Sequence, residues 1–600
     1  MCRKSLRRKA GNCDITHPFS YSREQVVIFI STNLTEQDRI QSHAQMLREL
    51  HLRSSIKRAT ESGDKKGARE IKAKVDREFV TKNWRITNHV LKPRGKEILH
   101  VETTAADGAI TSHDTKESLE EATMTCLSKR FSMAASSSFN QGQLIEDIGR
   151  DADRPAADAI LAGTYSPPHG TDCHSRGLIR VIGRVAAEVG SRRTSSLFSG
   201  LDFSNHWKRA RERTSSSVAN IHFGHYIAMS RDEFLSEVNA RMLQLIAHTV
   251  HSPHRWKHGM SVLLEKKPGV RLVDKLRGIL LLEGDCNMYN KVIFGVRMLD
   301  NAYSAGVIPR ENHAQRGSTA LEVAFLRLLT LDISRQRRHF MALASVDAAN
   351  CYDRVGHSFL SLACRAMGLP VKSIKVMTTT LSRMKFYLRS GYGDSARHYG
   401  ADPDNPLEGL CQGSGAAPAV WLVVSSMLIH YMRDEGCDIT ITSSMSSTIL
   451  RLCAWCFVDD TDTPSFCNGP HDTEAEMLLR LQRTVSLWEG SLRSTGGALT
   501  VVKSFCTLSI YRWNLDGTHF YGDPSSATPL FLTPDGAQRP IDTLHPDTAK
   551  EVMGVWQCAS GKMEKQMEMM KTKLMAWVTQ IEDGKLHQRN EWMAFWGTIW

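Results

Sequence analysis

The sequence has no hydrophobic run that approaches the ~20 apolar residues a membrane-spanning helix requires. Its longest apolar stretch, Ala419 to Met432, is interrupted by two serines and by His430. The 14 cysteines in 600 residues are too sparse for a secreted disulfide scaffold, and no N-terminal segment pairs a long apolar stretch with a cleavage site. We find no internal repeat, heptad array or long single-residue tract. These absences predict an intracellular chain, in the nucleus or the cytoplasm, that is not secreted and has no membrane partner.

The composition is that of a large globular protein. The chain of 600 residues is about four times the usual domain size, so two or more domains are expected. A hydrophobic content of 41% with 41 Gly and 19 Pro is ordinary for folded chains. Lys and Arg outnumber Asp and Glu by 76 to 64, giving a net charge of +12. A basic excess of this size favours an anionic partner such as nucleic acid or a membrane surface.

The first 250 residues carry few specific signals. Residues 1–35 form a basic tail that suits a nuclear signal, an organelle presequence, a phosphate-binding arm or simply a solvated end. Residues 36–140 are rich in charged helix formers, which predicts solvated helices. Over 103–220 Ser, Thr, Ala, Gly and Asp predominate, which predicts loops or linkers rather than a compact core. Residues 141–249 are accordingly assigned to a linker and an N-terminal extension.

Beyond residue 320 the hydrophobic pattern predicts a helix and then a β-α-β-β-α-β series, which is the split βαβ or ferredoxin-like arrangement. Such a sheet brings the end of its first strand beside the turn of its central hairpin. The expected elements are a helix over 321–338, a strand over 340–346, helices over 357–367 and 417–431, a hairpin over 449–466 turning at 459–460, a helix from 472 or 473 to 496, and a strand over 503–513.

Three carboxylates fall at the two places that this sheet brings together. Asp347 closes the first strand, and Asp459 and Asp460 occupy the hairpin turn. Unpaired, they would repel one another and raise one another's pKa. Mg²⁺, or Mn²⁺ in its place, would relieve that repulsion, and two such ions are the device by which polymerases activate a 3′-hydroxyl. An Asp-Asp pair by itself more often only occupies a β-turn. The neighbouring motifs therefore decide between a metal site and an ordinary turn.

Those motifs resemble the reverse transcriptases, the RNA-directed DNA polymerases, and most closely those of non-LTR-type retroelements. The resemblance runs in order from about residue 207 to the C-terminus. It includes an aromatic residue five positions after the first Asp, a Gln-Gly followed by Pro six positions after the Gln, and an aromatic followed by any residue and two Asp. The matching segments are Lys266-Lys267-Pro268-Gly269, Leu276-Arg277-Gly278-Ile279, Leu282-Glu283, 346–353, 410–418, Phe457-Val458-Asp459-Asp460, Gly496-Gly497-Ala498 with Lys503, and Met553-Gly554.

The resemblance implies catalytic roles for four residues and a primer-binding role for two more. The three carboxylates would hold the metal ions, and Lys503 would protonate the leaving pyrophosphate. A lone lysine that enters a strand is more often a surface residue, so both interpretations of Lys503 stay open. Met553 and Gly554 would form the primer grip.

Further residues would contact the incoming deoxynucleoside triphosphate. Arg277 with Lys266 or Lys267 would clamp its phosphates, since a guanidinium offers a planar fork of donors and an ammonium a point charge. The alternative for these residues is a solvated basic hairpin. Gly413 would let the backbone approach the nucleotide closely, and Gln412 can hydrogen-bond the template or the nucleotide.

Some positions have two interpretations or depart from the family pattern. Tyr352 lies under the incoming sugar in the family, whereas its apolar neighbours also suit a core aromatic on the strand. Phe457 replaces the more frequent Tyr, and Gly278 stands where many relatives have Pro, which would loosen the turn. Four residues have the spacing of a small zinc knuckle, but we expect core thiols because two of them lie in the central strand: Cys453, Cys456, Cys467 and His471.

We therefore expect an α+β right-hand polymerase, with fingers and palm over 250–560 and the start of a thumb over 561–600. The palm is expected to begin at 347, and the chain's end after an amphipathic stretch favours a truncated thumb. The expected function is DNA synthesis from deoxynucleoside triphosphates on a primed RNA or DNA template with Mg²⁺. Two alternatives stay open: a truncated or inactive element product that only binds nucleic acid, and an RNA-templated RNA polymerase.

Overall fold

The computed structural model describes residues 54–64, 66–73, 97–105, 107–211, 217–219, 221–337, 339–443, 445–467, 472–524, 527–534 and 536–584. The chain divides into two units. One comprises residues 1–94 and 569–600, and its described part is helical over 54–61, over 66–73 and along most of α19 (Glu564–Gly584). The other comprises residues 95–568 and holds the remaining elements. The predictions for the tail over 1–35 and for His471 lie outside the described residues.

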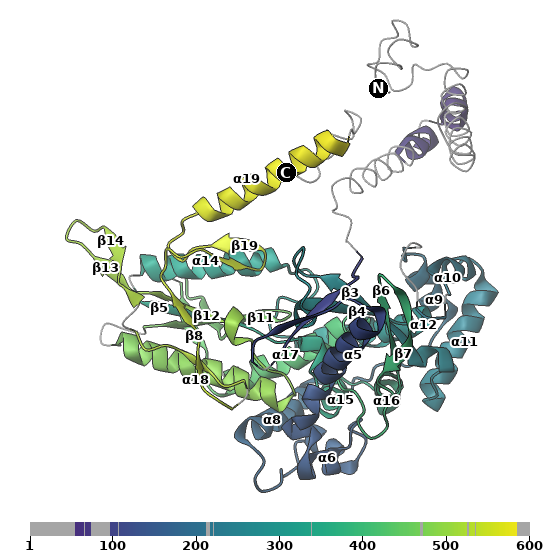
Figure 1. The fold of residues 1–600 in the computed structure, drawn as a ribbon, viewed down its shortest axis with the longest axis horizontal. Coiled ribbons are helices and arrows are strands. Elements are labelled where there is room, and N and C mark those ends of the chain that lie inside the picture. Colours follow the sequence, from purple (N-terminus) through teal and green to yellow (C-terminus); the bar gives the residue numbers. More distant parts are fainter. Residues whose placement is uncertain are drawn as a thin grey trace, which may run out of the picture. The chain divides into compact units, whose positions relative to one another are not determined.

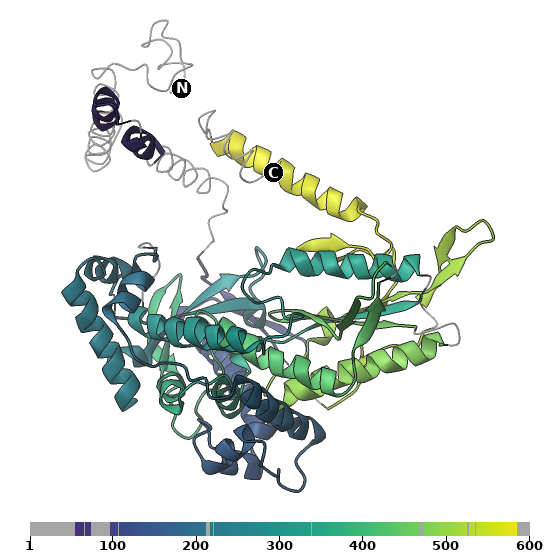
Figure 2. The ribbon, with the colours of Figure 1, turned by 180° about the vertical axis from the view of Figure 1, so that it is seen from behind.

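A five-stranded sheet with the order β10-β11-β5-β12-β17 forms the centre of the larger unit (Figures 1 and 2). Neighbours are antiparallel except at the edge, where β17 pairs in parallel with β12. The strands are β5 (Met341–Asp347), β10 (Trp455–Phe457), β11 (Asp460–Phe466), β12 (Phe505–Ser509) and β17 (Asp542–Leu544). The protein is thus of mixed α and β structure.

Helical connections link these strands in the predicted order. From β5 the chain passes through α15 (His357–Ala366), α16 (Val371–Ser382) and α17 (Ala417–Asp434) to β10, and from β11 it passes through α18 (Glu474–Ser494) to β12. Each connection joins two strands that enclose one antiparallel strand between them. A capping box of Thr473 and Glu476 begins α18 where the sequence predicts.

Both faces of the sheet are buried, as β5 illustrates. Alternate residues of a strand point to opposite faces. Met341 and Leu343 belong to a hydrophobic cluster with α14 (Ala320–Gln336), whereas Ala342 and Ala344 belong to the larger cluster on the other face. Helices therefore cover the sheet on both sides, with α14 and α18 on opposite sides in Figure 1.

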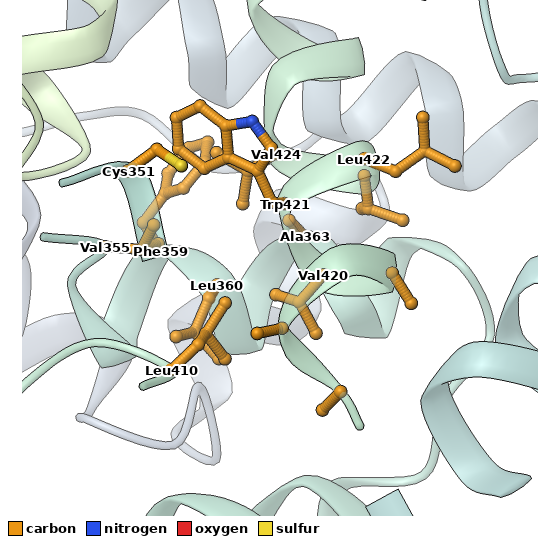
Figure 3. Packing of buried hydrophobic residues seen from close by; sticks show 14 of the residues in the cluster. Cys351, Val355, Phe359, Leu360, Ala363, Leu410, Val420, Trp421, Leu422 and Val424 are labelled. Carbon is orange, nitrogen blue, oxygen red and sulfur yellow. The ribbon is translucent and has the colours of Figure 1, made fainter. Parts of the chain in front are cut away.

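The larger cluster is built around α15 and α17 (Figure 3). Phe359 and Leu360 of α15 pack with Val420 and Trp421 of α17, and each of these side chains is at most 1% exposed. A helix that is apolar on every side needs such surroundings. Within the described ranges, no helix has the length together with the apolarity that crossing a bilayer demands.

A second sheet, with the order β4-β3-β6-β7, carries the basic hairpin. Its strands are β3 (His258–Glu265), β4 (Leu276–Leu281), β6 (Lys385–Ser390) and β7 (Gly393–Tyr399). The last two are not predicted from the sequence, because β7 buries only two of its seven residues. The helices that precede or follow β3 and β4 are α9 (Gly200–Trp207), α10 (Phe223–Met229), α11 (Glu233–Thr249), α12 (Gly284–Asn290) and α13 (Leu299–Ala305), the last two joined by a π-helical stretch over Lys291–Met298.

The prediction of loops or linkers over residues 103–220 is wrong. Two glycines of the helix α8 (Cys173–Val189) show why the small residues do not mark loops. A Cβ on Gly177 would lie 2.1 Å from the ring of Tyr431, and a Cβ on Gly183 would lie 2.8 Å from the Ile160 carbonyl oxygen. Small residues here allow helices to pack closely. The segment holds most of the hairpin β1 (Val101–Thr104)–β2 (Ile110–His113), α5 (Lys116–Ser132), α6 (Gly142–Ile148), α7 (Pro155–Leu161), α8 (Cys173–Val189) and α9.

Two predicted strands are broken. The one over 449–458 divides into β10 and β9 (Ile449–Leu452), which pairs with β8 (Ile439–Thr442) in another sheet. The one over 503–513 begins as a 3₁₀ turn and divides into β12 and β13 (Tyr511–Trp513), which pairs with β14 (His519–Tyr521). Buried residues continue across both breaks, so hydrophobicity does not reveal them. The remaining pairs are β15 (Phe531–Leu532) with β16 (Arg539–Pro540), and β18 (Lys550–Val552) with β19 (Val555–Gln557).

Candidate active site

Three carboxylates meet at one edge of the central sheet. Asp460 does not occupy the hairpin turn as predicted: it is the first residue of β11 and pairs directly with Asp347, the last residue of β5. Asp459 lies in the two-residue turn between β10 and β11, since Phe457 and Asp460 pair on either side of it. Residues directly opposite each other on antiparallel strands have Cβ atoms about 4.5–5.5 Å apart. The strand order thus brings the three predicted acids together.

The turn that carries Asp459 has a strained backbone. Val458 has φ 58°, a left-handed conformation that costs a β-branched residue on the order of 1–3 kcal/mol. Two hydrogen bonds hold the turn in place. The indole N–H of Trp421 donates to the carbonyl oxygen of Val458 (2.6 Å), and the N–H of Ala348 donates to that of Asp459 (2.8 Å). Such strain persists where the surroundings fix it, and it clusters at functional sites.

Burial and mutual repulsion set the charge state of these acids. The pKa of Asp460 is raised to about 7, first by burial and then by the negative charges of Asp459 and Asp347. Burial, together with the charge of Asp347, also raises the pKa of Asp459. A group of acids held together against this repulsion would be stabilised by a cation.

One cation lies within the group. Lys503 Nζ contacts both carboxylate oxygens of Asp347, at 2.7 and 3.0 Å. Lys503 is the last residue of a 3₁₀ turn (Val501–Lys503). The prediction that it begins a strand is therefore wrong. The N–H of Thr500 donates to the Asp347 carbonyl oxygen (2.9 Å) and fixes this turn beside β5. Lys503 is therefore part of the acidic site and not an isolated surface lysine.

The donor set also suits a hard divalent cation. Carboxylate oxygens are the ligands that Mg²⁺ and Mn²⁺ prefer. Such an ion would relieve the repulsion that adds to the effect of burial in raising the pKa of Asp460. In the part of the chain that the structure describes, no three His, Cys, Asp or Glu side chains stand in metal-ligand geometry. The three carboxylates fit such an ion by their residue type and by their crowding. In the conformation observed, Asp347 is paired with the Lys503 ammonium.

The hairpin of β3 and β4 carries three of the predicted basic residues. Lys266 and Lys267 follow β3, Arg277 lies on β4, and all three are exposed. Partial desolvation of its ammonium group and the positive charge of Lys503 lower the pKa of Lys266. Lys266 therefore lies within electrostatic reach of the acidic site, and the charge of the exposed Arg277 also acts on Lys266.

Arg130 is a candidate that the sequence patterns do not reveal. It lies in the last turn of α5, is 7% exposed, and its charge acts on both Lys266 and Asp353. Burial raises the pKa of Asp353 to about 6, and the positive charge of Arg130 opposes that rise. No local signal joins residue 130 to the hairpin, because α5 and β3 are far apart in the sequence.

A cavity of about 480 Å³ opens over Asp347 and Asp460. Its walls include Lys267 and also Met553 and Gly554, from the turn between β18 and β19. Met553 has φ 52° and Gly554 φ 81°, the pair of left-handed conformations that a type I′ hairpin turn requires. The predicted primer-grip residues and two of the carboxylates thus border one cavity.

Tyr352 lies beside the acids but not on a strand. It belongs to a 3₁₀ turn (Cys351–Asp353) after β5, so the predicted strand position is wrong. Its half-buried ring packs against the larger hydrophobic cluster. Burial raises the pKa of Tyr352, and the nearby charges of Cys351 and Asp459 add to the rise. The geometry is compatible with a contact to a substrate sugar as well as with a core role.

Gln412 and Gly413 lie against β4. The N–H of Leu280 donates to the Gln412 carbonyl oxygen (2.7 Å). Gly413 has φ 116°, and a Cβ there would lie 2.2 Å from the Leu280 carbonyl oxygen. Glycine is therefore required both by the backbone conformation and by the close approach of the two chains.

Gly413→Ala should destabilise the protein by about 2–3 kcal/mol, because it adds a steric clash to a disfavoured backbone conformation. Gly393→Ala is the matched control, since Gly393 has φ 93° and a Cβ added there would meet nothing within 4 Å. Thermal melting of both variants checks this expectation. Equal shifts in melting temperature would show that the contact with Leu280 does not constrain the loop.

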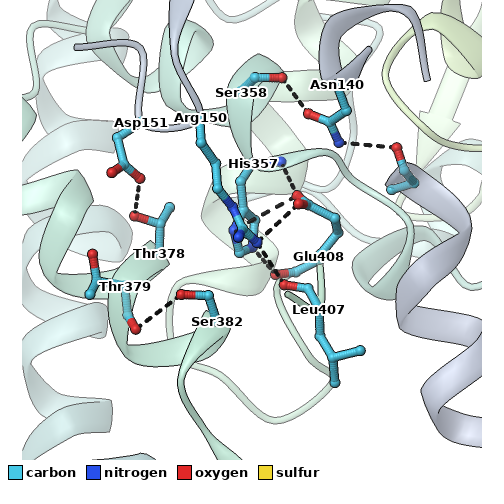
Figure 4. Close-up of polar contacts among 12 residues, drawn as sticks. Asn140, Arg150, Asp151, His357, Ser358, Thr378, Thr379, Ser382, Leu407 and Glu408 are labelled. Atoms are coloured by element: carbon cyan, nitrogen blue, oxygen red, sulfur yellow. Dashed lines mark hydrogen bonds and ion pairs between the residues drawn. The ribbon is translucent and has the colours of Figure 1, made fainter. Parts of the chain in front are cut away.

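A buried polar cluster holds the chain that leads to this loop (Figure 4). Arg150, between α6 and α7, pairs with Glu408 (2.9 Å) and donates to the Leu407 carbonyl oxygen (2.9 Å). The backbone N–H of His357, on α15, donates to the Glu408 carboxylate (2.6 Å), and its ring Nε2 bonds the Gly409 carbonyl oxygen (2.8 Å). These contacts fix residues 407–409, and through them the position of the loop.

Comparison with known proteins assigns the chain to no family. No protein-family model matches it, and no curated protein matches it significantly. The fold and the site define a protein of mixed α and β structure with a cavity at one edge of its central sheet. Carboxylates line this cavity, and one of them, Asp347, is paired with Lys503.

Proposed function

We propose that the protein is an RNA-directed DNA polymerase, the reverse transcriptase of a retrotransposon. The observation that carries the proposal is the direct pairing of Asp460 with Asp347, with Asp459 in the adjacent turn, in a sheet of split βαβ order. This agrees with the arrangement that the motif resemblance implies for a polymerase palm. In the proposal, the sheet containing β3 and β4 acts as the fingers, and α19 is the start of the thumb.

The three carboxylates would hold Mg²⁺, or Mn²⁺ in its place. The bound ions would supply the Lewis acidity that activates a primer 3′-hydroxyl and would neutralise charge on the leaving pyrophosphate. Lys503, at 2.7 Å from Asp347, would donate the proton to the leaving group. Its contact with Asp347 keeps the ammonium at the reacting end of the cavity.

The remaining residues would bind the substrates. Lys266, Lys267 and Arg277 would contact the triphosphate of a deoxynucleotide, and the loop of Gln412 and Gly413 would border its base or the template. Tyr352 would lie under the sugar. The turn of Met553 and Gly554, which borders the same cavity as the carboxylates, would hold the primer end.

Binding of a primed template should be electrostatic and nearly independent of sequence. The net charge is +12 and the fingers hairpin is basic, so phosphate contacts would release counterions. For several such contacts we expect affinity to fall ~10³-fold between 50 and 200 mM salt. Fluorescence anisotropy with two unrelated duplexes of equal length measures this, and a flat salt dependence would argue against a primer-template groove.

Primer extension with purified protein tests the proposal against its alternatives. A reverse transcriptase extends a primer on an RNA template with deoxynucleotides. An RNA-templated RNA polymerase requires ribonucleotides on the same template, and an inactive element product binds the duplex but extends it with neither set. The intact set of Asp347, Asp459 and Asp460 supports the first outcome.

A further inference from the structure

A buried polar network lies directly behind the candidate carboxylates. Residues two apart on a strand share a face, so Asp462 lies on the same face of the sheet as Asp460. Ser345, its partner on β5, lies on the same face as Asp347, and both network residues border the candidate cavity. The network has four members, each at most 8% exposed: Ser345 on β5, Asp462 on β11, Arg327 on α14 and Gln557 on β19.

One ion pair and three hydrogen bonds join these residues. Ser345 Oγ donates to one carboxylate oxygen of Asp462. Arg327 Nε lies 3.6 Å from the other oxygen, and its Nη1 donates to Gln557 Oε1 (3.0 Å). Gln557 Nε2 donates to the Ala324 carbonyl oxygen (2.9 Å), which returns the chain of contacts to α14. Arg327 is thus the central member, with β11 on one side and β19 on the other.

The network connects the catalytic strands with the hairpin of β18 and β19. That hairpin turns at Met553 and Gly554, and Gln557 is its last paired residue. It forms a separate two-stranded sheet, which has no strand pairing with the central sheet among the described residues. Its position relative to the central sheet therefore depends on side-chain contacts, which include this network, the packing of Met553 against the cluster of Met341 and Leu343, and the Lys550 ammonium over the Phe505 ring at 5.2 Å.

Stability alone does not account for such a network. A buried ion pair costs desolvation that its attraction hardly offsets, and apolar residues of similar volume often replace one without loss. The hydrogen bond from Arg327 to Gln557 does fix orientation, because a planar guanidinium presents its donors at set angles, whereas the 3.6 Å contact with Asp462 is an ion pair longer than a hydrogen bond. The two groups that Arg327 joins, a carboxylate and an amide, belong to the two elements whose separation matters for the proposed reaction.

We propose that Arg327 is a positioning residue, which holds the hairpin over 550–557 against β11 through Asp462 and Gln557. It would thereby set the distance between a primer end at Met553 and Gly554 and the catalytic acids. This inference rests on the proposed function, in which that hairpin binds the primer.

Gln557→Leu tests the link, because it separates β19 from Arg327 while it leaves the ion pair with Asp462 and the core volume in place. The kcat for addition of one deoxynucleotide should fall at least tenfold. KM for the nucleotide and Kd for the primed duplex should stay within threefold of wild type, since the binding surfaces remain. Gln482→Leu is the matched control: Gln482 on α18 bonds the backbone of Phe531 at 3.0 and 2.8 Å, away from the cavity, and its loss should leave kcat unchanged.

Amide hydrogen exchange tests the contact between Arg327 and the hairpin over 550–557 without depending on catalysis. In Gln557→Leu, exchange over 550–557 should accelerate at least tenfold while exchange over α17 stays at the wild-type rate. If that variant does not fold, the paired variant Arg327→Met with Asp462→Leu, which removes both charges together, is measured in the same way. If wild type extends no primer, the proposed function fails, and hydrogen exchange alone then decides the link.

The inference is overturned by a fall in kcat of less than tenfold in a folded, active enzyme, or by a fall matched by weaker nucleotide binding. It is also overturned if exchange over 550–557 accelerates less than tenfold or accelerates only together with that of α17. The last result would show general loosening of the fold and not the loss of a specific contact.

Discussion

Asp347→Asn should abolish nucleotide addition while folding and duplex affinity stay near wild type. The change removes a charge at the centre of the acidic site and keeps the side-chain volume. A loss of metal-assisted catalysis on the order of a thousandfold, or about 4 kcal/mol, is expected. The partner Lys503 has a side chain that is 55% exposed, so water can solvate it in the variant. Single-turnover extension with Mg²⁺, a thermal melt and a duplex titration provide the three readouts.

Asp434→Asn is the matched control for this variant. Asp434 is an exposed carboxylate at the end of α17, paired with Arg184 at 2.9 Å. Its loss should leave extension, melting and binding at wild-type values, because an exposed ion pair contributes little. Extension by Asp347→Asn within tenfold of wild type would contradict the metal-ligand assignment.

Tyr352→Ala should admit ribonucleotides while most deoxynucleotide activity remains. The half-buried ring lies beside Asp459, and in the proposed complex a ribose 2′-hydroxyl would collide with it. Overlap with a packed ring costs about 1–3 kcal/mol, which corresponds to roughly ten- to a hundredfold discrimination. The readout is the ratio of kcat/KM for deoxy- and ribonucleotides in wild type and variant.

Tyr303→Ala controls for the loss of a partly buried tyrosine. Tyr303 also packs against the larger hydrophobic cluster but belongs to α13, and Arg316 stacks on its ring at 5.6 Å. Both variants should lose stability, and only Tyr352→Ala should change sugar preference. If Tyr352→Ala melts earlier with its preference unchanged, the ring is a core aromatic and not a sugar gate.

The strands β5 and β11 and the helix α18 are predictable because each has its own local signal, whereas β17 has none that we recognised. The cap at Thr473 and the apolar face that follows predict α18, and the buried run up to Asp347 predicts β5. The pairing of β11 with β5, which allows Asp460 to lie opposite Asp347, depends on the strand order that the split βαβ topology predicts. Sequence reasoning therefore succeeds where local patterning and topology agree.

The remaining features depend on contacts between distant segments. The composition around α8 predicts a loop or linker, and only the close contact of Gly177 with the ring of Tyr431 explains its small residues. Arg130 reaches the basic hairpin from α5, and Arg327 meets Gln557 across 230 positions of the chain. No periodicity encodes such partners, because each residue type is also compatible with an exposed surface.

Templated addition of single nucleotides tests the central claim most directly. A primer is annealed to four RNA templates that differ only in the first template base, and each of the four deoxynucleotides is supplied alone with Mg²⁺. The proposed function predicts one added nucleotide in the complementary pairs, none in the twelve mismatched pairs above a few per cent, and none with Asp347→Asn. Addition that ignores the template base, or no addition by folded wild type that binds the duplex, would contradict a template-directed polymerase.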